Sequence, residues 1–145
     1  MSEFPVRTDI EVRFRDTDAM AHVNNAAYVT YLEVGRQAYW KAMDTGKTYD
    51  KVPFVLANVS IDFRAPATSG DIVCVHLKST WISRKSWGMS YRLANPEDTV
   101  LFAEAESVQV AFDYAAGRVM EVPDWLRIKI ESLEGRPLPE PVVER

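Results

Sequence analysis

Apolar and polar residues alternate in several stretches of the chain, as they do in β-strands with one buried face. The first alternation covers residues 10–14 and predicts a strand that ends near Phe14. Longer apolar or alternating runs cover residues 55–63, 72–82, 87–93 and 100–112. Turn-forming residues, among them Pro66 and Gly70, separate these runs. We therefore expect hairpins in a mainly antiparallel sheet.

Two other segments show the three- and four-residue spacing of amphipathic helices. The longer covers residues 28–42, with Asn24 or Asn25 as its cap and Gly46 as its stop. The shorter covers residues 125–133, close to the end of the chain. The predicted order is thus one strand, the long helix, several further strands and the short helix. This order predicts an α+β fold class.

Small residues on the apolar stripe of the long helix suggest how the layers pack. Gly35 and Ala38 lie on this stripe and would allow the helix axis to approach a curved surface. We therefore expect a long central helix wrapped by a curved, mainly antiparallel sheet. Residues 1–135 would form this single domain, and residues 136–145 a proline-rich carboxy-terminal tail.

Composition narrows the class of protein. The chain has 145 residues, of which 47% are hydrophobic and 26% charged, values typical of a globular domain with one core. Its net charge is −4 and its 17 basic residues are scattered, which argues against a nucleic-acid interface. No stretch approaches the roughly 20 apolar residues of a membrane helix, and residues 1–9 show no targeting pattern. We expect a cytoplasmic protein without membrane insertion.

Few residue types are available for catalysis. Cys74 is the single cysteine and lies in an apolar strand run, which predicts a buried side chain and excludes an intrachain disulfide. The chain contains neither a phosphate-binding glycine loop nor a nucleophile elbow. Asp16, Asp18 and His22 lie close together in sequence, but this spacing is a weak indication of a metal site, and we expect no metal.

The remaining candidate is Asp18, which precedes the amino terminus of the long helix. Backbone N–H groups at a helix amino terminus lack intrahelical partners and can polarise a carbonyl oxygen. A nearby carboxylate could attack an activated acyl group or activate water. A thioester suits this apparatus best, because its thiolate leaves without strong protonation. The alternative is that Asp16 and Asp18 only form turns.

A longer sequence resemblance begins at these residues. The segment Asp-Thr-Asp-Ala-Met-Ala-His-Val-Asn-Asn-Ala-Ala-Tyr at 16–28, followed by Tyr-Leu-Glu-Val-Gly-Arg at 31–36, resembles the hotdog-fold acyl-CoA thioesterases of the 4-hydroxybenzoyl-CoA thioesterase family, in its His-Val-Asn-Asn branch. Phe-Arg-Ala-Pro at 63–66 and the order of the elements extend the resemblance over most of the chain. It implies hydrolysis of a fatty or aromatic acyl-CoA to free acid and coenzyme A, without a cofactor.

The resemblance also implies roles for individual residues. Asp18 matches the catalytic carboxylate, which acts as nucleophile or as general base. Asn25 matches the position whose backbone N–H polarises the thioester carbonyl, and His22 would shape the site or orient water. The residues that we expect to bind substrate are Asn24, Arg64, Arg84, Lys85 and Ser86. The basic residues among them suit coenzyme A phosphates, although they could equally be solvated turn charges.

In such domains the active site forms between two subunits, so the resemblance implies a homodimer or homotetramer. Three other functions stay open: a non-catalytic module that binds acyl-CoA or acyl carrier protein, a thioesterase acting on acyl carrier protein, and an interaction protein that uses its sheet edge. A hotdog dehydratase fits less well, because residues 28–43 contain no histidine.

Overall fold

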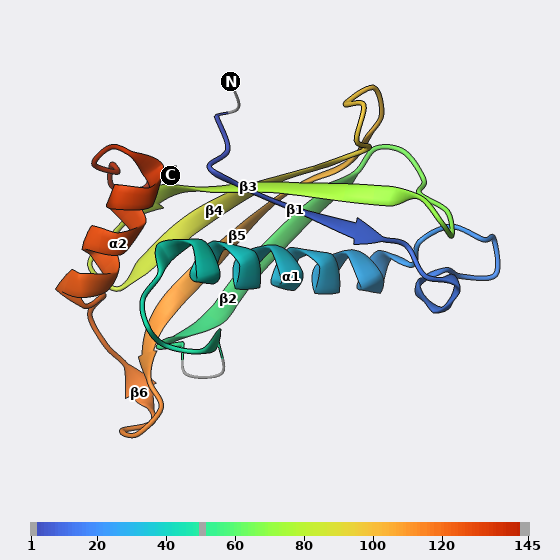
Figure 1. Ribbon diagram of the computed structural model, residues 1–145. Helices are drawn as coiled ribbons and strands as arrows, with labels where there is room; N and C mark the ends of the chain where they lie inside the picture. The colour runs from blue at the N-terminus through green and yellow to red at the C-terminus, as the bar shows by residue number, and fades with distance from the viewer. Residues whose placement is uncertain (1–2, 50–51, 143–145) are drawn as a thin grey trace.

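The computed structural model describes residues 3–49 and 52–142, which form one curved sheet, a long helix and a short helix (Figure 1). The elements in chain order are β1 (Val6–Glu11), the 3-10 turn η1 (Phe14–Asp16), α1 (Asn25–Met43), β2 (Phe54–Phe63), β3 (Ile72–Ile82), β4 (Ser86–Ala94), β5 (Leu101–Asp113), β6 (Arg118–Val119) and α2 (Asp124–Glu134). The strands are antiparallel in the order β1-β3-β4-β5-β2, and β6 pairs with β5. The α+β class and the expected layer arrangement are confirmed.

Helix α1 lies along one face of the sheet, where it packs mainly against β1 and β3 (Figure 1). Leu32 of α1 is fully buried, and so are Val75 and Leu77 of β3. Gly35 lets the two layers approach, because a Cβ at this position would lie only 3.0 Å from Val75 Cγ1. The inner face of the sheet therefore carries the core of the protein.

Strand β2 forms an edge of this sheet, and within the described residues it pairs only with β5. Its side chains Val59 and Ile61 are only half-buried, and Phe63 is 47% exposed. The reason is that α1 packs near the opposite edge of the sheet, against β1 and β3. An apolar strip and a row of backbone groups are thus left uncovered along β2.

Two predicted boundaries were wrong. The first strand spans Val6–Glu11 and does not reach Phe14, whose side chain is 84% exposed. The chain turns instead at Arg13, because the Asp16 carboxylate accepts the Arg13 backbone N–H at 3.1 Å. The long helix ends at Met43, before Gly46, because Asp44 adopts the left-handed conformation at its cap.

Helix α2 and the segment after it close one end of β3. The Glu134 carboxylate accepts hydrogen bonds from the Ser79 backbone N–H at 2.8 Å and from the Tyr39 hydroxyl at 2.6 Å. The Ile82 backbone N–H donates to the Pro139 carbonyl at 3.0 Å. Within the described ranges, no helix is long and apolar enough to cross a membrane.

Candidate active site

The loop between η1 and α1 folds into a small hairpin that carries the candidate catalytic residue. Thr17 and Val23 form a β-bridge, and the Asp18 N–H donates to the His22 carbonyl at 2.8 Å. The hairpin also contacts the connection between β2 and β3, because the Val23 N–H donates to the Ala67 carbonyl at 2.8 Å. Asp18 is therefore presented from an ordered hydrogen-bonded loop.

The Asp18 carboxylate is oriented by its own loop but keeps one oxygen available. Oδ1 accepts the backbone N–H groups of Met20 at 2.8 Å and His22 at 3.3 Å. The other oxygen, Oδ2, has neither a hydrogen-bond partner nor an ion-pair partner among the described residues 3–49 and 52–142. The side chain is exposed. A carboxylate held through one oxygen and open at the other can accept a proton or attack an electrophile.

The amino terminus of α1 lies next along the chain. The Asn24 side chain caps the helix by accepting the Ala26 N–H at 2.8 Å, and the Asn24 carbonyl accepts the Ala27 N–H at 2.8 Å. The Asn25 N–H has no acceptor in the part of the chain that the structure describes. This amide is available to a carbonyl oxygen and carries the positive end of the helix dipole.

Asp18 and Asn25 line a common cavity of about 280 Å³. Its full lining consists of Asp18, His22, Val23, Asn25, Tyr28, Phe63, Arg64, Ala65 and Pro66. Tyr28 and Phe63 form an aromatic wall, with ring centroids 5.4 Å apart. The structure thus brings four of the sequence-predicted residues together, Asp18, His22, Asn25 and Arg64, and adds the aromatic wall that we had not predicted as part of the site.

The other predicted residues lie elsewhere. Asn24 serves as the helix cap described above, and it is not among the cavity-lining residues. Arg84, Lys85 and Ser86 lie at the turn between β3 and β4, beside α2 and at the opposite end of the sheet from the Asp18 loop (Figure 1). Arg84 faces Glu121 at 3.7 Å, and the Ser86 hydroxyl lies 2.7 Å from that of Ser83. Within one chain these three residues do not reach the cavity.

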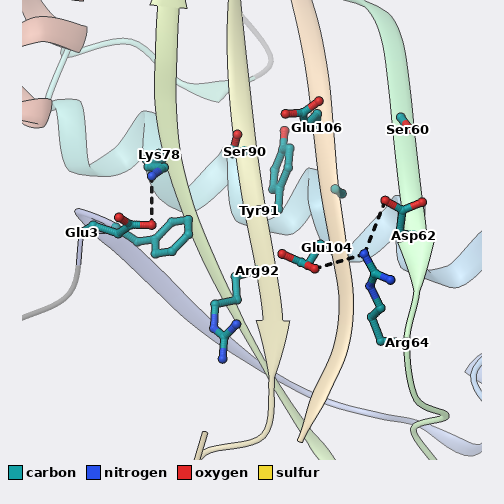
Figure 2. Close-up of a pocket in the computed structure, with 12 residues that line it drawn as sticks. Glu3, Ser60, Asp62, Arg64, Lys78, Ser90, Tyr91, Arg92, Glu104 and Glu106 are labelled. Atoms are coloured by element: carbon teal, nitrogen blue, oxygen red, sulfur yellow. Dashed lines mark ion pairs between the residues drawn. The ribbon is translucent and has the colours of Figure 1, made fainter.

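Arg64 connects the cavity with the outer face of the sheet. Its guanidinium lies 3.3 Å from Glu104 and 3.9 Å from Asp62 (Figure 2). Both carboxylates belong to a larger, strongly polar hollow of about 480 Å³ on the outer face, which also contains Lys78 and Arg92. Neither Asp18 nor Asn25 lines this hollow. The charge of Arg64 is therefore partly neutralised by carboxylates outside the cavity.

A second carboxylate near the site behaves differently from Asp18. Asp16 is buried and accepts hydrogen bonds from Arg13 and from the Tyr31 hydroxyl. Burial opposes its ionisation, but these hydrogen bonds outweigh burial and hold the pKa of Asp16 below its ordinary value. Asp16 is therefore a fully bonded structural anion, unlike Asp18.

No group of three or more metal-binding side chains occurs in the described ranges.

Arg36 is a buried charge that the sequence did not reveal. Its side chain is buried, and its Nη1 lies 3.1 Å from the Tyr91 hydroxyl. The Tyr91 hydroxyl in turn lies 2.6 Å from the Ser107 hydroxyl. Within the described residues, Arg36 Nε lacks a hydrogen-bond partner. These contacts join α1 to β4 and β5.

Comparison with known proteins identifies relatives of the chain. Residues 12–130 match the profile of the thioesterase-like superfamily. The long-chain acyl-CoA thioesterase FadM of Escherichia coli K12 is 26% identical over 133 residues, which cover 88% of this chain and 98% of FadM. A 1,4-dihydroxy-2-naphthoyl-CoA hydrolase of Nostoc punctiforme is 27% identical, covering 86% of this chain and 88% of that protein.

A solved structure is similar as well. A thioesterase of Thermus thermophilus, determined in complex with coenzyme A and zinc, has a TM-score of 0.86 and 33% sequence identity. The match covers 95% of this chain and 100% of the Thermus chain. The expected hotdog fold is confirmed by this likeness together with the family match.

Proposed function

This chain belongs to the thioesterase-like superfamily, and we propose that it is an acyl-CoA thioesterase that hydrolyses a fatty or aromatic acyl-CoA to free acid and coenzyme A. One observation carries the proposal: the open Asp18 oxygen and the unbonded Asn25 N–H belong to residues that line one cavity. The relatives named above act on acyl-CoA thioesters with long-chain or aromatic acyl groups. The finer assignment to the 4-hydroxybenzoyl-CoA branch is part of this proposal.

The catalytic step follows from the two groups. The Asn25 N–H donates to the thioester carbonyl oxygen and stabilises the negative charge that develops there. Asp18 accepts a proton from a water molecule, and the resulting hydroxide attacks the carbonyl carbon. The C–S bond then breaks and coenzyme A leaves as a thiolate. The thiolate takes up the proton that Asp18 had accepted from water. His22, which also lines the cavity, orients the water.

An alternative route gives the same products through a covalent intermediate. Asp18 Oδ2 attacks the carbonyl carbon, expels the thiolate and forms a mixed anhydride, which water then hydrolyses. A single turnover in ¹⁸O-labelled water tests for the anhydride. Label in Asp18 would establish the covalent route, because direct water attack labels only the released acid.

One chain alone supplies only part of a surface for the acyl group. Tyr28 and Phe63 supply aromatic surface beside Asp18, and the half-buried Val59 and Ile61 continue it along β2. We propose that a second copy at the β2 edge completes the pocket, in a homodimer or homotetramer. The uncovered backbone edge and apolar strip of β2 support this assembly.

A panel of short, long and aromatic acyl-CoA thioesters tests the function through release of free thiol. Asp18→Asn should lower the rate about 100-fold or more, because general-base catalysis contributes about 10²–10⁴. Asp44→Asn is the matched control, since Asp44 is exposed at the other end of α1. Thiol release that is equal in both variants would exclude this role for Asp18.

The same assay, extended to acyl carrier protein thioesters, addresses the other candidate functions. Ligand binding without turnover, equal in the wild type and Asp18→Asn, would indicate a binding module. Turnover of acyl carrier protein thioesters but not of acyl-CoA would assign a carrier-protein thioesterase. Neither binding nor turnover would favour an interaction protein. Arg64→Gln and Lys85→Gln, compared for KM, would show which predicted cation meets the coenzyme A phosphates.

A further inference from the structure

Asp16 joins two parts of the structure that flank the Asp18 loop, the segment after β1 and the helix α1. Its carboxylate accepts the backbone N–H of Arg13 at 3.1 Å and the Arg13 guanidinium at 3.0 Å, just beyond the end of β1. The same carboxylate accepts the Tyr31 hydroxyl at 2.9 Å, from the second turn of α1. The Asp16 side chain is only 8% exposed, so these bonds are shielded from water.

The backbone of Asp16 closes the loop itself. The Asp16 carbonyl accepts the Asn24 N–H at 2.8 Å, so the chain that leaves at Asp16 returns to the same residue before α1 begins. The Thr17–Val23 bridge is the next rung of this hairpin. Asp18, which donates its N–H to the His22 carbonyl, is thus two rungs away from the point where Asp16 and Asn24 meet. Asn25, which lines the cavity, directly follows Asn24.

The Tyr31 hydrogen bond fixes this junction to the body of the helix. The first turn of a helix lacks half of its backbone hydrogen bonds and frays most easily. A bond to the second turn therefore holds the loop more firmly than contacts with the first turn alone. Arg13 adds a restraint from the strand side. These contacts therefore restrain the residues on both sides of the Asp18 loop.

We propose that Asp16 is a positioning residue for the thioesterase reaction, which holds the Asp18 loop against α1 through Tyr31 and Arg13. The proposal rests on the proposed function, because it assumes that Asp18 and the Asn25 amide act on one thioester. Asp16 itself is buried beneath the loop and does not line the cavity. Its contribution is the geometry of two other groups, and small misplacements of reacting groups strongly reduce turnover.

Tyr31→Phe is the sharpest test, because it removes one hydroxyl group from the Asp16 contacts. Tyr39→Phe is a matched control on the same helix, since the Tyr39 hydroxyl also donates to a carboxylate, that of Glu134, at 2.6 Å. Both variants lose one phenol–carboxylate hydrogen bond, but only Tyr31 lies beneath the Asp18 loop. Arg13→Gln is a second variant that alters the exposed side of the same junction.

We expect Tyr31→Phe to lower kcat about tenfold or more, with KM changed by less than about twofold. Tyr39→Phe should keep the wild-type kcat. The unfolding midpoints of Tyr39→Phe and Tyr31→Phe should be lowered to a similar extent. Arg13→Gln should lower kcat in the same direction as Tyr31→Phe. Wild-type kcat in both Tyr31→Phe and Arg13→Gln, or an equal loss in Tyr39→Phe, would overturn the positioning role.

Amide hydrogen exchange provides a readout that does not depend on activity. Exchange in the segment 17–25 should accelerate about tenfold or more in Tyr31→Phe and stay unchanged in Tyr39→Phe, because only the first variant releases the loop. Unchanged exchange in Tyr31→Phe would refute the proposal. If the wild type releases no thiol from any thioester, the proposed function fails, and exchange alone then decides whether Asp16 holds the loop.

Discussion

Replacement of Gly35 by alanine tests how tightly α1 is packed against β3. The new Cβ would lie 3.0 Å from Val75 Cγ1, and 3.5 and 3.6 Å from the two methyl groups of Leu77. The Leu77 distances are ordinary contacts, whereas the Val75 methyl group would have to move away by a few tenths of an ångström. The conflict is therefore confined to a single methyl group of Val75.

Two opposing free energies determine the result. Alanine favours a helix interior by about 1 kcal/mol relative to glycine. Overpacking of a close-packed core costs about 1–3 kcal/mol. Gly35→Ala should therefore leave the free energy of unfolding unchanged or lower it by up to about 2 kcal/mol. In a Val75→Ala background the clash is absent, so the same change should stabilise the protein by about 1 kcal/mol.

Urea unfolding of the four proteins in this cycle measures the difference between the two backgrounds. We expect a coupling free energy of about 1–3 kcal/mol between positions 35 and 75. Equal effects of Gly35→Ala in both backgrounds would refute the reasoning, because the helix would then have room for the methyl group without Val75 moving.

Three further predictions concern the capping, core and acid behaviour of the chain. Asn24→Ala should lower the unfolding free energy by about 1 kcal/mol, whereas Asn24→Ser, which can still accept the Ala26 N–H, should cost little in the same urea assay. Tyr91→Phe removes an acceptor from buried Arg36, so thermal and urea unfolding should show a loss of about 1–3 kcal/mol. Asp16 has a lowered pKa, so its stabilisation is complete above the unfolded pKa of about 3.9 and is lost as the pH falls through the lower folded value. Unfolding midpoints between about pH 6 and pH 2 should therefore fall more steeply for the wild type than for Asp16→Asn.

The sheet after residue 54 could be predicted from sequence because its apolar runs are long and turn residues separate them. The same parity of side chains also holds in and just after β1, where Val6 and Val12 are buried. The predicted end of this strand was wrong for a local reason that alternation does not reveal. The Asp16 carboxylate captures the Arg13 amide and turns the chain.

The candidate site was predictable where it is local in sequence. Asp18 and Asn25 lie on one short loop and the helix that it precedes, so their proximity follows from the chain itself. Phe63 comes from a strand far along the sequence, and only the packing of β2 near the loop brings it to the cavity. The buried contact of Arg36 could not be predicted for the same reason, because its partner Tyr91 belongs to β4. Periodicity describes one element at a time and cannot supply such contacts.

The carboxy-terminal segment affects how the protein behaves in concentrated solution. β1 pairs with β3 only as far as Leu77, and in the part of the chain that the structure describes the later amides of β3 have no neighbouring strand on that side. The Glu134 carboxylate and the Pro139 carbonyl occupy two of them, at Ser79 and Ile82. A chain cut after β6 would leave these amides unpaired beside apolar surface, and such an edge can pair with strands of other molecules and aggregate. The prolines of the carboxy-terminal segment have no N–H to donate to an added strand, so the segment covers the edge of β3 without offering a new one.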